Sequence, residues 1–149
     1  MSGRVLGVDV GDRRVGLAIS DASRTLARPL TTVKVTDVHD AVDRVARTIA
    51  ELAAGEDGLE AIVVGLPARL DGSPTTATPR VQAFIDALRA RTAVRVVTEG
   101  ERLTSREAES RLAVNERDWR KRKEKLDAAA AAIILQDYLD RGLTDDRNG

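Results

Sequence analysis

The sequence has no cysteine and only one histidine, His39. The missing cysteines exclude disulfide bonds, thiolate zinc sites and a cysteine nucleophile. A single histidine cannot build a histidine-rich metal site. Any metal ion bound by this chain must therefore be held by oxygen ligands, which favours Mg²⁺, Mn²⁺ or Ca²⁺.

Aromatic residues and net charge are also scarce. Phe84, Trp119 and Tyr138 are the only aromatic side chains, which argues against a stacking platform for single-stranded bases. Lysine plus arginine number 24, and aspartate plus glutamate also number 24. A nucleic-acid-binding surface would therefore have to come from local segregation of charge.

The chain lacks any apolar run long enough to cross a bilayer, and its first residues show no signal-peptide pattern. Its composition, 42% hydrophobic and 32% charged, is typical of a soluble globular protein. We therefore expect a cytoplasmic protein with no membrane partner. A length of 149 residues suits one domain, which we place at residues 1–142, with a polar tail at 143–149.

The chain begins with two apolar runs around a glycine-containing turn, between Val5 and Asp21. This pattern predicts a β-hairpin whose strands are covered on both faces. Asp9 lies inside the first run, where an unpaired carboxylate would cost several kcal/mol. Either it accepts hydrogen bonds from backbone amides of its own turn, or it belongs to a cation site.

After the hairpin, the sequence predicts alternating helices and strands. Pro29 places one strand, at 25–35, on a sheet edge, and Thr104 starts a capping box that begins a helix. The order β-β-β-α-β-α-β-α-α predicts an α/β domain with a mixed five-stranded sheet and helices on both faces. The other expected elements are helices at 37–54, 78–91 and 126–139 and strands at 60–65 and 94–99.

A strongly basic segment, residues 115–125, precedes the last helix and is expected to form a loop. Most charge runs are simply solvated, and that interpretation stays open here. The alternative is a contact with the phosphate backbone of a nucleic acid. The basic residues are Arg117, Arg120, Lys121, Arg122, Lys123 and Lys125.

Three acidic residues lie where acids are not expected. Asp9 is inside the first strand, Glu101 follows the last strand, and Asp127 shares the apolar face of an alanine-rich helix. Ligands in open α/β sheets bind beyond the carboxyl ends of the strands, so the three carboxylates could meet there around divalent cations. Taken singly, a cap would explain Glu101, and a salt bridge to a neighbour such as Lys123 would explain Asp127.

Five short motifs follow one another along nearly the whole chain, from the first strand to the last helix. They are Asp9-x-Gly11, Val63-Val64-Gly65-Leu66-Pro67, Asp71-Gly72-Ser73, Glu101-Arg102-Leu103-Thr104 and Asp127-x-x-Ala130-Ala131. Each motif is weak alone, but the combination in this order is specific. It resembles the YqgF family, also called RuvX, of the RNase H-like superfamily, near the RuvC-type Holliday-junction resolvases.

This resemblance implies an RNase H-like fold and a cytoplasmic, divalent-metal-dependent nuclease using Mg²⁺ or Mn²⁺. The implied substrate is precursor 16S ribosomal RNA, in ribosome biogenesis, or branched DNA, and we favour RNA over DNA as the partner. The family's candidate catalytic residues and metal ligands carry over to Asp9, Glu101 and Asp127. We expect substrate contacts from Arg102, which orients Glu101 or the scissile phosphate, and from Arg120, Lys121, Arg122, Lys123 and Lys125.

Two positions depart from the family pattern. Gly100 stands where the family usually has an aspartate before Glu101, and Ser105 replaces the second of two threonines.

Two other functions stay open: a phosphate-binding ATPase-like domain, and an RNA-binding module without catalysis. Symmetric junction resolution would need a dimer; the sequence shows no dimerisation signature and leaves monomer or homodimer open.

Overall fold

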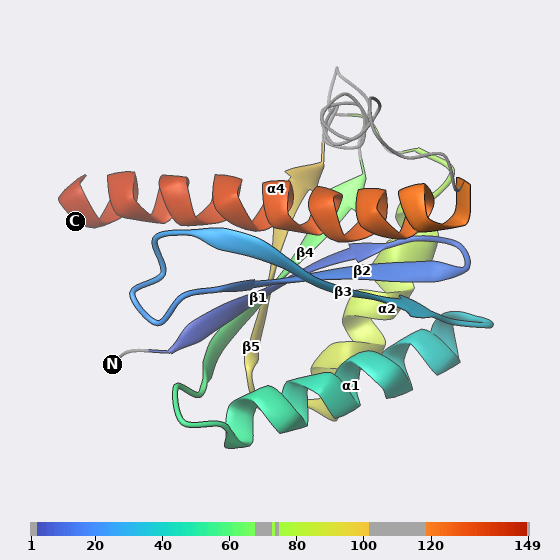
Figure 1. Ribbon diagram of the computed structural model, residues 1–149, viewed down its shortest axis with the longest axis horizontal. Helices are drawn as coiled ribbons and strands as arrows, with labels where there is room; N and C mark the ends of the chain where they lie inside the picture. Colours follow the sequence, from blue (N-terminus) through green and yellow to red (C-terminus); the bar gives the residue numbers. More distant parts are fainter. Residues whose placement is uncertain (1–2, 68–72, 74, 102–118, 149) are drawn as a thin grey trace.

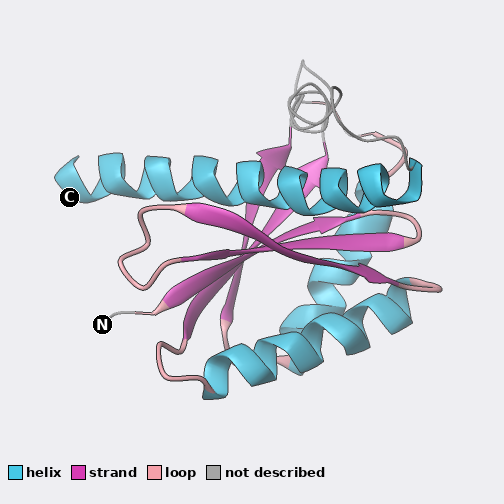
Figure 2. Ribbon diagram, viewed as in Figure 1, coloured by secondary structure: helices cyan, strands magenta, loops and turns pink. Residues whose placement is uncertain are grey.

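A computed structural model describes residues 3–67, 73, 75–101 and 119–148 of the chain, and the side chains of 101, 119–125 and 143–148 lie outside this description. The described part forms one five-stranded sheet with three helices (Figures 1 and 2). The strands are β1 (Arg4–Val10), β2 (Arg14–Ser20), β3 (Ala27–Lys34), β4 (Leu59–Pro67) and β5 (Arg95–Glu101). The helices are α1 (Val38–Ala54), α2 (Thr78–Arg91) and α4 (Trp119–Asn148).

The strand order in the sheet is β3-β2-β1-β4-β5, which confirms the predicted mixed sheet. The first three strands pair antiparallel, as a hairpin and its extension. Strands β1, β4 and β5 run parallel, so their carboxyl ends lie at the same edge of the sheet. Strand β3 is an edge strand, as Pro29 predicted.

Helices cover both faces of the sheet, and each face has its own apolar core. Figure 1 shows α4 across one face and α1 and α2 on the other. Because successive side chains of a strand point to opposite faces, β1 supplies Leu6 and Val8 to the α1–α2 core and Val5 to the α4 core. The central strands are therefore buried on both faces, as their nearly continuous apolar runs predicted.

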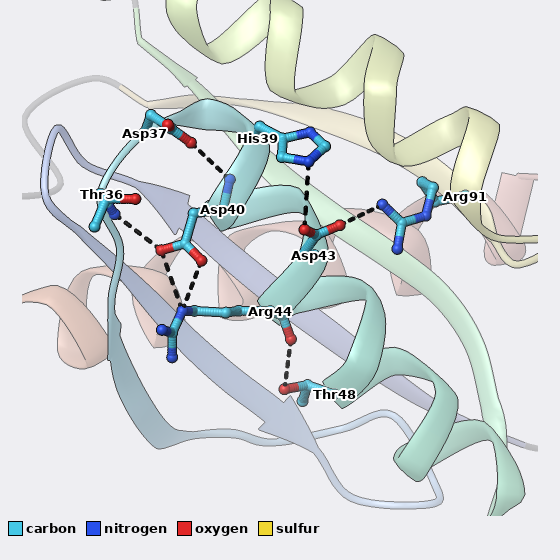
Figure 3. Close-up of polar contacts among 8 residues, drawn as sticks. All are labelled: Thr36, Asp37, His39, Asp40, Asp43, Arg44, Thr48 and Arg91. Carbon is cyan, nitrogen blue, oxygen red and sulfur yellow. Dashed lines mark hydrogen bonds and ion pairs between the residues drawn. The ribbon is translucent and has the colours of Figure 1, made fainter.

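Side-chain hydrogen bonds hold α1 and α2 in place on the face of the sheet opposite α4. The Asp40 amide donates to the Asp37 side chain at 2.8 Å, which caps α1 at the start of the helix predicted for 37–54. Arg91 of α2 donates to Asp43 of α1 and so ties the two helices together. Figure 3 shows these contacts, with His39 near Asp43. The exposed His39 takes no part in the site described below.

Helix α4 differs most from the prediction. It begins at Trp119, so the loop expected up to residue 125 is wrong for positions 119–125, which are helical. Arginine, lysine and glutamate are good helix formers, so a strongly charged segment can be helical. The helix also continues beyond its predicted end at residue 139, passes Gly142 and runs to Asn148 through the predicted tail. One glycine costs a helix only about 1 kcal/mol.

Two further expectations concern a helix at Thr104 and a membrane span. The helix predicted to begin at Thr104 lies outside them. Within them, no helix is long and apolar enough to span a membrane.

Candidate functional site

The turn between β1 and β2 forms one side of the candidate site. The Gly11 amide donates to the Arg14 carbonyl at 2.8 Å and closes the turn. A Cβ at position 11 would lie 2.6 Å from that carbonyl oxygen, so only glycine fits. The turn follows Asp9 almost at once, and it places this acid at the carboxyl end of β1.

Asp9 faces the layer that α4 occupies. Strand alternation puts it on the same face as Val5 and Gly7, both of which contact α4. It is half-buried, whereas its neighbours Val8 and Val10 are buried on the other face. Across the hairpin, Asp9 pairs with Gly16 of β2.

Two glycines let α4 lie directly on the sheet. A Cβ at Gly16 would lie 2.0 Å from the Asp127 carbonyl oxygen, and a Cβ at Gly7 would lie 2.9 Å from the Ala131 carbonyl oxygen. Any side chain at Gly16 would push α4 away from the sheet at Asp127. Since Asp9 is the strand partner of Gly16 and Asp127 lies over Gly16, the structure brings these two predicted site residues together.

The Asp127 side chain forms an ion pair with the sheet. Arg14 Nε donates to Asp127 Oδ2 at 3.0 Å, and the two side chains are 21% and 27% exposed. Both residues line a pocket of about 350 Å³ with Gly11, Asp12 and Arg13. A salt bridge for Asp127 was one of the two interpretations of the sequence, but the partner is Arg14 on β2, and the side chain of Lys123 is not described. The two interpretations are compatible, because the same carboxylate borders an open pocket.

The third predicted acid, Glu101, is the last residue of β5, where it pairs with Pro67. Strand β4 separates β5 from β1, so the two strands are about 9–10 Å apart at the same sheet edge. The Glu101 side chain and all of Arg102 lie outside the described residues. Among the described side chains, no group of three acids or histidines is placed to hold a metal ion.

The basic residues predicted to bind substrate belong to the first two turns of α4. Residues Arg120, Lys121, Arg122, Lys123 and Lys125 are helical, and their side chains lie outside the description. Figure 1 shows this end of α4 beside the β1–β2 turn. The backbone therefore brings the basic segment to the same end of the molecule as Asp9 and Asp127.

Glu99 was not among the predicted site residues; it is only 3% exposed and pairs with Arg141 of α4. Burial raises the pKa of the Glu99 carboxyl, Arg141 opposes that rise, and the nearby Asp137 adds to it. The alternation of β5 indicates that Glu99 faces α4, because residues two apart in a strand share a face and Val97 packs in the α4 core. No such pattern distinguished Arg14, because it follows Asp12 and Arg13 directly and the sequence does not show which of these charged side chains reaches the site.

The donor set fits a hard divalent cation. Asp9 and Asp127 offer carboxylate oxygens, which Mg²⁺ and Mn²⁺ prefer. Asp9 belongs to the central strand β1, and Asp127 belongs to α4, whose backbone packs directly against Gly16 of the sheet. Together with the open pocket beside Asp127, these acids give the site oxygen ligands and access from solvent.

Comparisons with known proteins agree with this geometry. The family model described as "RuvX: Holliday junction resolvase" matches residues 3–141. A relative from Chloroflexus aggregans, provisionally named a pre-16S rRNA nuclease, is 43% identical over 91% of this chain and 92% of its own length. A relative from Roseiflexus sp., with the same provisional name, is 38% identical over 93% of this chain and 94% of its own length.

The solved structures support the same fold. RuvC from Thermus thermophilus, solved in complex with a Holliday junction substrate, superposes with a TM-score of 0.53. The match covers 95% of this chain and 96% of RuvC at 19% identity. The RNase H-like fold predicted for this chain is thereby confirmed.

Proposed function

This chain belongs to the RuvX family, and we propose that it is a divalent-metal-dependent nuclease that hydrolyses phosphodiester bonds. Precursor 16S ribosomal RNA is the favoured substrate, because the curated relatives carry that substrate in their names. One structural observation supports the proposal above the others: Gly16 lies between Asp9, its strand partner, and Asp127, whose backbone lies over it.

In this proposal Asp9 and Asp127 hold Mg²⁺ or Mn²⁺, and Glu101 completes the ligand set from the end of β5. A bound divalent ion supplies an activated water and stabilises the leaving oxygen. The chain itself supplies rigid placement. β1 fixes Asp9 within a sheet buried on both faces, and the contact at Gly16 fixes the backbone of Asp127.

Substrate binding is proposed for Arg102 and for the basic start of α4. A guanidinium next to Glu101 can bind a carboxylate or a phosphate through two hydrogen bonds. Within α4, Arg120 precedes Asp127 by two turns and Lys123 precedes it by one turn. Helical periodicity therefore puts these two positions on the same face of the helix as Asp127. Contacts from these residues and from Lys121, Arg122 and Lys125 to phosphates would give affinity without sequence preference.

A cleavage panel tests this function. The full chain is incubated with Mg²⁺ or Mn²⁺ and, in turn, with single-stranded RNA, structured ribosomal precursor RNA and four-way DNA junctions. We expect metal-dependent cleavage of the precursor RNA, and its loss in Asp9→Asn and in Asp127→Asn. Asp86→Asn removes an exposed carboxylate from α2, on the opposite face of the sheet, and should cleave like wild type.

Branched DNA is the second candidate substrate, because the family model and the RuvC structure are both named for Holliday junctions. Cleavage of junctions alone would assign the site to DNA. Binding of RNA that survives Asp9→Asn, with no cleavage of any substrate in Mn²⁺, would contradict the proposal and favour a binding module without catalysis.

A further inference from the structure

We propose that Arg14 is a positioning residue of the metal site, which holds the Asp127 carboxylate in the metal-free protein and competes with the cation for it. This inference rests on the proposed function, because it assigns Asp127 to the cation. It gives a role to a side chain for which the sequence offered none.

The backbone places Arg14 with little freedom. It is the first residue of β2, its carbonyl accepts the Gly11 amide, and it pairs with Lys34 of β3. Strand alternation puts it on the same face as Gly16, over which α4 lies. The guanidinium therefore reaches Asp127 from a fixed strand end, and the 3.0 Å contact from Nε follows from this placement.

The ion pair opposes cation binding in two ways. The guanidinium donates to Oδ2 and so occupies one of the two carboxylate oxygens that a divalent ion could bind. Its positive charge also repels a second cation at short range. Because both side chains border an open pocket and are only partly buried, the pair can break without stranding a charge in the core.

The neighbouring Arg13 offers a matched control. It carries the same charge, is exposed and lines the same pocket. Its carbonyl accepts a hydrogen bond from the Val35 amide, and among the described residues its guanidinium makes no hydrogen bond or ion pair. Replacing Arg13 therefore changes the charge near the pocket without releasing Asp127.

The test is a calorimetric titration of the full chain with Mn²⁺ at physiological ionic strength. We expect Arg14→Gln to bind Mn²⁺ about fivefold more tightly than wild type, the size expected for losing a partly exposed competing ion pair. Arg13→Gln should change the affinity by less than about twofold, because salt screens charges that are not in contact. Equal changes in both variants, or weaker binding by Arg14→Gln, would overturn the role of Arg14 and leave the proposed function standing.

A double-mutant cycle shows whether Arg14 acts through Asp127. In the Asp127→Asn background only the charge repulsion from Arg14 remains, so Arg14→Gln should alter the residual Mn²⁺ affinity by less than about twofold, and an undiminished change would contradict the inference. Melting curves check that the variants fold, and Arg14→Lys, which keeps the charge, should bind with intermediate affinity if Arg14→Gln does not fold. Absence of Mn²⁺ binding by the wild type would contradict the proposed metal site itself, and the inference with it.

Discussion

Two ion pairs join the described side chains of helix α4 to the sheet, and the two pairs lie in different surroundings. Near its start, Asp127 meets Arg14 of β2 beside an open pocket, and both side chains are partly exposed. Near its other end, Arg141 meets Glu99 of β5, whose carboxylate is buried. In the first pair the helix supplies the acid, and in the second it supplies the base.

Solvent exposure separates the roles that the two pairs can take. A partly exposed carboxylate can exchange one partner for another at little cost, which suits a ligand of a metal ion. A buried carboxylate that loses its partner leaves an uncompensated charge, which suits a structural contact. We therefore assign Asp127 to the site and Glu99 to the attachment of α4.

The largest effect is expected where α4 lies on the sheet. Gly16→Ala would place a methyl group 2.0 Å from the Asp127 carbonyl oxygen, which must move the helix. We expect the free energy of unfolding to fall by about 3 kcal/mol or more, the upper range for overpacking against rigid backbone. Gly100→Ala, where nothing lies within 4 Å of the new methyl group, is the control in denaturant melts. Equal stability of the two variants would refute the contact.

The buried pair gives the next effect. Arg141→Ala should lower the free energy of unfolding at pH 7 by about 1–3 kcal/mol, because Glu99 stays buried without its partner. The loss should shrink in acid, where Glu99 becomes neutral. Arg47→Ala removes an exposed arginine of α1 and should change stability little. If the two variants melt alike, the Glu99–Arg141 pair is not structural.

The pH dependence distinguishes Glu99 from an ordinary acid. Because burial raises its pKa, Glu99 favours the folded state when protonated, and this contribution is lost as pH rises from about 4.5 through the folded pKa. Glu99→Gln should therefore gain stability relative to wild type as pH rises through that window. The pKa of Asp43 is lowered, chiefly by the hydrogen bond from Arg91. Asp43 therefore stabilises the folded state when it is charged, and Asp43→Asn should lose stability relative to wild type as pH rises. Melting Glu99→Gln between pH 4 and 8, and Asp43→Asn from about pH 5 down through and below 3.8, would show whether the signs differ.

The smallest effect is expected at the partly exposed pair. Asp127→Asn in the metal-free protein should change the free energy of unfolding by only about 0–1 kcal/mol, the usual range for such pairs. A loss as large as that of Arg141→Ala, measured under the same conditions, would remove the distinction between the two pairs and make Asp127 a structural residue.

The sequence predicted most of the fold because its signals are local. Apolar runs gave the strands, and Pro29 gave the edge strand. The extent of α4 was missed because charge suggested a loop, although arginine and lysine also favour helices. Asp9 and Asp127 could be proposed as site residues because acids are out of place in apolar patterns.

Long-range contacts could not be predicted in the same way. The pair of Arg14 with Asp127 joins positions far apart in the chain, and Arg13 looked equally suitable in the sequence. The seating of α4 on Gly16 depends on the register of β1 and β2 as well as on the alanines of the helix. These contacts appear only once the helix is placed on the sheet.

The most direct test of the account is Mn²⁺-induced thermal stabilisation of four proteins: wild type, Asp9→Asn, Asp127→Asn and Asp86→Asn. A cation that binds only the folded state stabilises it by about 2.7 kcal/mol at one hundred times its dissociation constant. The account predicts that wild type and Asp86→Asn share this gain, and that Asp9→Asn and Asp127→Asn each lose most of it while staying folded. A full Mn²⁺ response in Asp9→Asn and Asp127→Asn would contradict the claim that these two carboxylates hold the metal ion.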